Sequence, residues 1–149
     1  MSGYTNQYLA STVFSASPEQ LLLMLYDGAI RFISLGIQAI DNNQIESRTR
    51  FINKTSAIIS EFAATLDHSR NAQLTADLDA LYRYMLTRLM QANLKNDAEP
   101  LIEVKEMLVD LRTTWAQAIE ISKEEKRAAA GFRTPTDAPL SYRPLAAAM

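Results

Sequence analysis

The sequence predicts an all-α fold, an antiparallel four-helix bundle whose helices run up, down, up and down. Between Ser17 and Arg127 the chain has only two glycines and two prolines, so long helices can form there. Apolar residues in that stretch recur at helical spacing in four blocks, and the short connections between the blocks favour antiparallel neighbours. No strand pattern competes with this interpretation. We expect one bundle domain at 17–127, between a flexible N-terminal segment (1–16) and a flexible, proline-containing tail (128–149).

The first helix is expected from Pro18 to about Ile40. Ser17 can cap it, Pro18 fits the first helical position, where its missing N–H costs nothing, and Gln20 completes a capping box with Ser17. The turn residues at positions 41–43 end this helix.

Three more helices follow from polar stretches that separate the apolar rows. We expect the second helix to end near Asp67, the third to lie between the polar stretches 68–71 and 93–97, and the fourth to run from Asp97 until after Lys126. The rows expected to face the core are Leu22, Leu25, Ala29, Ile33, Gly36 and Ile40; Ile45, Ile52, Ile59, Phe62 and Leu66; Leu74, Leu78, Leu81, Tyr82, Met85, Leu89 and Ala92; and Leu101, Val104, Leu108, Leu111, Trp115 and Ile119.

The composition excludes several classes of protein. Without cysteine, the chain has no disulfide framework, no thiolate metal site and no cysteine nucleophile. Its net charge of -2 lacks the cationic excess of proteins that neutralise nucleic-acid phosphates, so nucleic acid is not an expected partner. Residues 1–9 contain neither Lys nor Arg nor a long apolar run, so we expect no signal peptide, no insertion into a membrane, and a cytoplasmic location.

The sequence contains no catalytic or metal-binding motif. A carboxylate-bridged metal pair in a bundle needs Glu-x-x-His on two helices, but the only histidine, His68, has Ala64 and Thr65 where a glutamate is needed. The four dispersed glycines form no phosphate-binding loop and no nucleophile elbow. We therefore expect no enzymatic activity, no metal and no cofactor. The alternative is a histidine phosphotransfer bundle that uses His68, although this residue falls at an expected helix end beside Asp67.

The first helix has more apolar residues than a bundle core can use. Its polar residues fall in a sector roughly 80° wide, whereas a core-facing stripe needs about 100° or somewhat more. Two second rows have a spacing of seven: Leu23, Ile30 and Ile37 in the first helix, and Ile102, Val109 and Ala116 in the fourth. Further apolar residues widen the other side of the first helix: Leu21, Met24, Phe32 and Leu35.

We interpret this surplus as a groove for an amphipathic segment of a partner. The residues expected to bind the partner are Leu23, Tyr26, Ile30, Ile37, Ile102 and Val109. A lid over the groove is expected from the apolar residues of the N-terminal segment: Tyr4, Tyr8, Val13 and Phe14. Two alternatives to this groove stay open: the first helix is simply the most enclosed element, or the surplus rows drive self-association of a structural bundle. For Tyr26, Tyr82 and Tyr84, the alternative is a ring half in the core with its hydroxyl reaching water or backbone.

Two long motifs resemble the FliS family of flagellar secretion chaperones. Residues 15–32 (SASPEQLLLMLYDGAIRF) are similar to the signature opening of that family, and residues 81–93 (LYRYMLTRLMQAN) look like its third helix. The region of Trp115 looks like its fourth helix, and the tyrosine-bearing N-terminal segment is also similar. The tail after Gly131 extends beyond the usual end of the family.

The resemblance implies an antiparallel bundle that binds the C-terminal segment of flagellin in the cytoplasm. Masking this disordered segment prevents premature polymerisation, and the complex is then delivered to the export gate at the membrane. The resemblance also implies that the client wraps around the bundle and that the N-terminal segment can cover part of the site.

Overall fold

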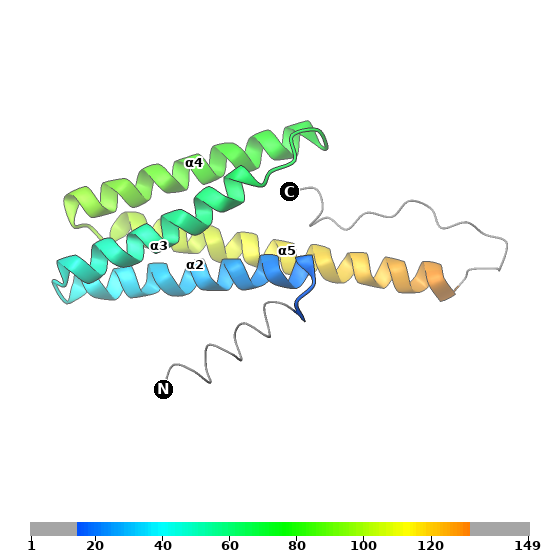
Figure 1. Cartoon of the computed structure of the whole chain (residues 1–149), viewed down its shortest axis with the longest axis horizontal. Coiled ribbons are helices and arrows are strands. Elements are labelled where there is room, and N and C mark those ends of the chain that lie inside the picture. Colours follow the sequence, from blue (N-terminus) through cyan, green and yellow to red (C-terminus); the bar gives the residue numbers. More distant parts are fainter. Residues whose placement is uncertain (1–14, 132–149) are drawn as a thin grey trace.

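The computed structural model describes residues 15–131, which form four long helices: α2 (Pro18–Asp41), α3 (Ile45–Ala64), α4 (Ala72–Lys95) and α5 (Glu99–Gly131). Consecutive helices run in opposite directions, and α5 lies beside α2 (Figure 1). Each helix packs against two others, α2 and α4 both contacting α3 and α5, so the four helices form a closed ring around one core. The all-α antiparallel bundle expected from the sequence is confirmed.

The capping box expected at the start of α2 is present. The backbone N–H of Gln20 donates to Ser17 Oγ at 3.1 Å, and the backbone N–H of Ser17 donates to Gln20 Oε1 at 3.0 Å. Pro18 occupies the first turn, where no intrahelical partner for its nitrogen is needed. The helix therefore begins where the sequence predicts, and it ends at Asp41, one residue after Ile40.

The turn between α3 and α4 is longer than expected. α3 ends at Ala64, three residues before Asp67. The carboxylate of Asp67 instead accepts the backbone N–H of Ser69 at 3.1 Å, which stabilises the turn. Asn71 is the N-cap of α4, and its side-chain oxygen accepts a hydrogen bond from the backbone N–H of Leu74 at 3.2 Å.

The end of α4 is marked by Asn96, which adopts a left-handed backbone conformation with φ of 50°. Arg48 of α3 fastens this end, because its Nε donates to Asn93 Oδ1 and its Nη1 donates to Asn96 Oδ1, both at 2.8 Å. The helix that follows, α5, continues to Gly131, so residues 128–131 are helical although they were expected to belong to the tail. Its last turns project beyond the start of α2 (Figure 1).

The core contains a row of apolar side chains from every helix. The buried members are Leu22, Tyr26, Ala29, Ile33, Ile40, Ile52, Ile59, Phe62, Leu66, Leu78, Tyr82, Met85, Leu89, Ala92, Leu101, Val104, Leu108 and Trp115. Four leucines of the expected rows pack at the edge of this core and are only partly buried: Leu25, Leu74, Leu81 and Leu111. The expectation for Ile45 is wrong: it is 60% exposed, because it is the first residue of α3 at the end of the bundle.

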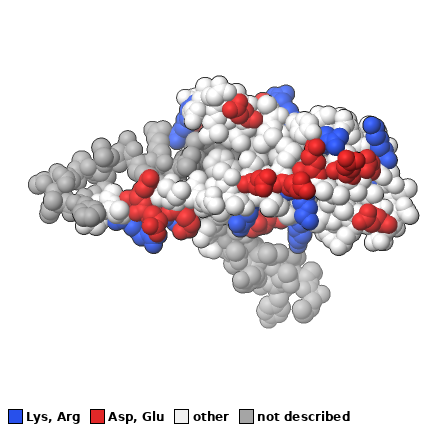
Figure 2. Space-filling view, turned by 180° about the vertical axis from the view of Figure 1, so that it is seen from behind, with Lys and Arg blue, Asp and Glu red and all other residues white. Residues whose placement is uncertain are grey.

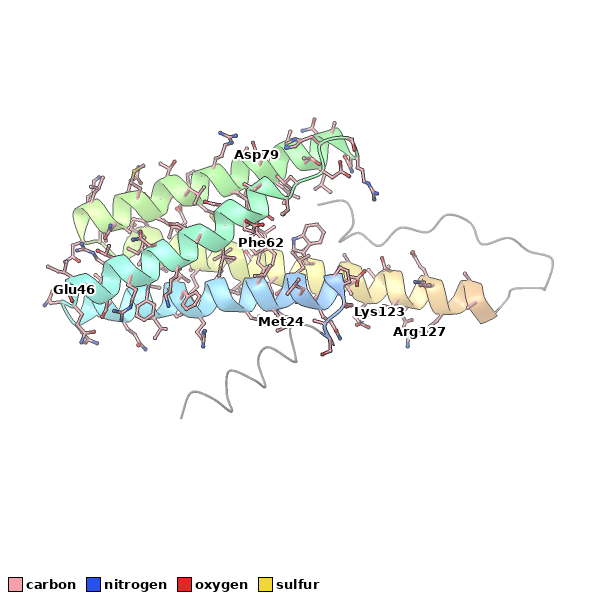
Figure 3. The ribbon with its side chains drawn as sticks, viewed as in Figure 1. Met24, Glu46, Phe62, Asp79, Lys123 and Arg127 are labelled. Carbon is pink, nitrogen blue, oxygen red and sulfur yellow. The ribbon has the colours of Figure 1, made fainter. Side chains whose placement is uncertain are left out.

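Four aromatic residues, one from each helix, meet inside the bundle. Tyr26 of α2 stacks on Phe62 of α3 with ring centroids 4.4 Å apart, and Phe62 points from α3 toward α2 (Figure 3). The Tyr26 and Tyr82 hydroxyls share a hydrogen bond of 2.8 Å, and the Trp115 indole N–H donates to the Tyr26 hydroxyl at 3.2 Å. Burial raises the pKa of both tyrosines, so their hydroxyls stay neutral. This aromatic cluster joins all four helices.

The length and composition of α2 alone would suit a membrane-spanning helix. In the bundle, seven of its residues are buried within the protein, and it packs against both α3 and α5. A position between two neighbouring helices therefore explains part of its apolar composition.

Removing the Tyr26 hydroxyl is expected to destabilise the bundle more than removing the Tyr82 hydroxyl. Tyr26→Phe leaves the Trp115 N–H and the Tyr82 hydroxyl without their partner in the core, at a cost of about 1–3 kcal/mol for each unsatisfied group. Tyr82→Phe keeps the bond between Trp115 and Tyr26, so the loss should be about 0.5–1.5 kcal/mol. Urea unfolding followed by the fluorescence of the single tryptophan measures both values. Equal losses would contradict the shared role of the Tyr26 hydroxyl.

Gly28→Ala is expected to stabilise the protein. A Cβ added at Gly28 would lie 3.7 Å from Ile58 Cδ1, an ordinary contact distance. Because glycine within a helix costs about 0.5–1 kcal/mol relative to alanine, the free energy of unfolding should rise by about that amount. Gly36→Ala is the matched control, and its gain should be smaller because the new Cβ would lie 3.4 Å from Leu101 Cδ1. A lower melting temperature for Gly28→Ala would show that α2 and α3 have no room for the methyl group.

Candidate functional site

The second apolar rows of α2 and α5 lie on the same side of the bundle, along the line where the two helices meet. An ion pair identifies this side, since Arg112 Nε of α5 lies 2.9 Å from Asp27 Oδ1 of α2. Leu23 and Ile30 stand four residues before and three residues after Asp27, so they share its face of α2. Val109, three residues before Arg112, shares the corresponding face of α5.

The two rows also stand at matching levels. The two helices are antiparallel, and Asp27 of α2 pairs with Arg112 of α5. A residue that follows Asp27 by some number of positions therefore lies level, along the helix axes, with the residue that precedes Arg112 by the same number. Three steps reach Ile30 and Val109, ten steps reach Ile37 and Ile102, and four steps in the opposite sense reach Leu23 and Ala116. We call these six residues the α2–α5 seam.

The seam is apolar and accessible. Ile102 is 45% exposed and Val109 is 40% exposed, while Leu23, Ile30 and Ile37 are partly buried against the core. None of these five side chains is enclosed by the bundle. The apolar surplus of the sequence therefore remains at the surface, and α2 is not sealed by its two neighbours.

Tyr26, which the sequence pattern places on the binding surface, lies in the core instead. Its side chain is 0% exposed, and its hydroxyl is bonded to Tyr82 and Trp115. The alternative of a ring half in the core, with the hydroxyl reaching water or backbone, is also wrong, because two core side chains satisfy the hydroxyl. Tyr26 therefore belongs to the core and has no exposed surface for a partner to contact.

Polar contacts fasten both sides of α5. Asp27 pairs with Arg112 and not with Arg31, its neighbour four residues along the same helix. On the α4 side, the carboxylate of Glu103 accepts hydrogen bonds from the Tyr84 hydroxyl and from Arg88 Nε, the latter at 3.0 Å. The Tyr84 bond, followed by the Arg88 contacts, lowers the pKa of Glu103 and favours its charged form. Sequence spacing gives no signal for either contact, because both join different helices.

The remaining sequence candidates lie outside the described residues or away from the seam. The four expected lid residues, Tyr4, Tyr8, Val13 and Phe14, lie outside the described residues. His68 is exposed in the turn between α3 and α4. Within residues 15–131, no three His, Cys, Asp or Glu side chains gather in a way that could hold a metal ion.

Known proteins similar to this chain are flagellar chaperones. The model of the family "Flagellar protein FliS" matches residues 1–122, and Ser122 is the last buried residue of α5. The flagellar secretion chaperone FliS of Bacillus subtilis (strain 168) is 40% identical over 125 residues, which are 84% of this chain and 92% of the relative. The FliS chaperones of Escherichia coli (strain K12) and Salmonella typhimurium (strain LT2) are 34% identical over 119 residues and 33% identical over 118 residues. Each match covers 78% of this chain; it covers 86% of the Escherichia coli protein and 87% of the Salmonella typhimurium protein.

Val109→Asp is expected to leave the bundle folded, whereas Val104→Asp, on the same helix, should unfold it. Val109 is 40% exposed, so a carboxylate there stays hydrated and stability should change by about 0.5 kcal/mol or less. Val104 is 0% exposed, and an unpaired charge there should cost about 3–5 kcal/mol. Urea unfolding of both variants makes the comparison. A large decrease in the free energy of unfolding for Val109→Asp would show that this part of the seam belongs to the core.

Proposed function

This chain belongs to the FliS family of flagellar secretion chaperones, and we propose that it binds the C-terminal segment of flagellin in the cytoplasm. The bound segment is kept from polymerising early and is delivered to the flagellar export gate at the membrane. The observation that carries this proposal is the accessible apolar α2–α5 seam. A protein with this task acts by binding, so it needs a surface of this kind and no catalytic group, metal or cofactor.

The dimensions of the seam suit one amphipathic helix of the client. From Leu23 to Ile37 the seam spans fourteen residues of α2, which is about 21 Å at 1.5 Å per residue. A client helix of that length presents an apolar side chain every three or four residues along one face. Each such side chain contributes about 1.5–3 kcal/mol when it is fully removed from water, so three or four anchors are enough for a specific complex.

Coupled folding of the client keeps this contact reversible. A disordered segment must be ordered when it binds, and this ordering consumes about 2–5 kcal/mol of the gross interaction energy. The complex can therefore cover the apolar residues that drive flagellin polymerisation and still release them at the export gate. A rigid client with the same apolar area would leave the seam far more slowly.

We further propose that the N-terminal segment competes with the client for the seam. Residues 1–14 precede the start of α2, close in sequence to Leu23. Fourteen extended residues reach at most about 46–50 Å, which exceeds the length of the seam. The apolar side chains available for this contact are Tyr4, Tyr8, Val13 and Phe14. A segment that occupies the site in the free protein lowers the apparent affinity and so tunes release.

Calorimetric titration of the full chain with a flagellin C-terminal peptide tests the proposal. We expect a one-to-one complex with a negative heat-capacity change, because apolar surface is buried. Ile30→Asp should weaken binding by about tenfold or more while lowering the melting temperature only slightly, because it removes one apolar anchor.

Ile121→Asp is the matched control for this titration. Ile121 is 57% exposed on α5 but lies about 140° around the helix from the seam residue Ala116, so its substitution should leave the affinity unchanged. Absence of binding at micromolar concentrations would refute the flagellin proposal. A loss of affinity in the control as large as in Ile30→Asp would place the site elsewhere.

A further inference from the structure

The side of α2 that meets α3, away from the α2–α5 seam, carries a second surface. Two partly buried phenylalanines, Phe32 of α2 and Phe51 of α3, stack here with ring centroids 6.3 Å apart. Three cations stand over these rings: Arg31 Cζ lies 5.1 Å and Lys54 Nζ 5.2 Å from the Phe32 centroid, and Arg50 Cζ lies 5.0 Å from the Phe51 centroid. We call these five residues the cation–aromatic platform.

The cations of the platform form no ion pair within 4.0 Å with any residue of 15–131. Every ion pair within 4.0 Å in this range involves a different Lys or Arg. Glu46 stands one turn before Arg50 but does not pair with it within 4.0 Å, Glu61 follows Lys54 by seven residues, which is about 10 Å along α3, and Asp27 is engaged by Arg112. Outside the platform, acidic side chains exceed basic ones in residues 15–131, and on the face seen in Figure 2 many acidic side chains lie next to one another. Three like charges close together, none of them in an ion pair within 4.0 Å, favour binding of an anionic group.

The rings hold the three cations near one another. A cation over an aromatic face is attracted by the ring quadrupole, so the side chains of the platform are partly ordered before any partner arrives. Arg50 Nη2 donates to Ser47 Oγ at 3.5 Å, and a guanidinium has further N–H groups that can donate to a carboxylate. Leu35, partly buried and three residues after Phe32 on the same side of α2, offers apolar contact beside these donors.

We propose that the cation–aromatic platform binds an acidic segment of a partner protein. An anionic membrane is a poorer fit, because polybasic membrane sites use about 4–8 cations and the platform has three. A nucleic acid is a poorer fit as well, because its bases stack on open aromatic faces, whereas cations already cover the rings here. An acidic segment with apolar residues between its carboxylates matches both the charge and the neighbouring apolar surface.

The platform and the seam border different neighbours of α2, namely α3 and α5. A partner on the platform therefore meets α3 as well as α2, whereas a client of the seam meets α5 as well as α2. The inference does not depend on the identity of the seam's client, and the two sites can be tested separately.

An NMR titration of the full chain tests this inference. The probe is a synthetic peptide of about 15 residues built from Glu and Leu, long enough to form a helix when bound, and its control has Gln in place of Glu. We expect the Glu peptide to shift the amide signals around Arg31, Arg50 and Lys54, and the Gln peptide to leave them unchanged. The triple variant R31A/R50A/K54A should bind the Glu peptide about tenfold more weakly at low salt.

The control variant K123A/K126A/R127A removes the same charge from another place. Lys123 and Arg127 lie on the part of α5 that projects past the bundle (Figure 3), so this variant should retain the affinity for the Glu peptide within about twofold. If the platform triple variant fails to fold, Arg31→Ala and Lys54→Ala made singly should each weaken binding more than Lys126→Ala.

Three outcomes would overturn the inference: equal binding of the Gln peptide, unchanged affinity in the platform variants, or stronger binding of phosphatidylglycerol vesicles or oligothymidine to the same amides. The platform triple variant should still bind the flagellin peptide, so failure of either site can be told from failure of the other.

Discussion

The hydroxyl group of Tyr26 is the point on which the arrangement of the bundle depends. It accepts the indole N–H of Trp115 from α5 and shares a hydrogen bond with Tyr82 from α4, while its ring stacks on Phe62 from α3. Because these contacts reach three other helices, they fix the rotation of α2 about its own axis. Once that rotation is set, every other face of α2 has a defined direction, with Ile30 beside α5 and Phe32 beside α3.

A fixed α2 explains how one helix can serve two chemically different surfaces. Each helix of the closed ring has two neighbours, and the apolar residues of α2 extend beyond what the core requires on both sides. On the α5 side they form an apolar seam whose helices are clamped by Asp27 and Arg112. On the α3 side, aromatic rings lie beside cations that form no ion pair within 4.0 Å among the described residues. The rigid core thus separates a surface for apolar segments from a surface for acidic ones.

The sequence was sufficient to predict the elements and most of the core, because caps and periodicity are local signals. The capping box at Ser17 and the apolar rows are examples that the structure confirms. The site was only partly predictable. Periodicity shows that Leu23 and Ile30 exceed the needs of the core, but it cannot show that the Tyr26 hydroxyl finds partners on two distant helices. The pairing of Asp27 with Arg112, 85 residues away, likewise depends on the helix register and not on sequence spacing.

The last helix, α5, extends beyond the packed body of the bundle. Packing of α5 ends at Ser122, and the nine residues from there to Gly131 add about 14 Å of helix with every side chain exposed. Pairs one turn apart, such as Lys123 with Glu120 and Arg127 with Glu124, brace this arm from within. A fluorescent reporter or an immobilisation tag joined after Gly131 would therefore stand clear of the body of the molecule, on a spacer that the protein itself provides.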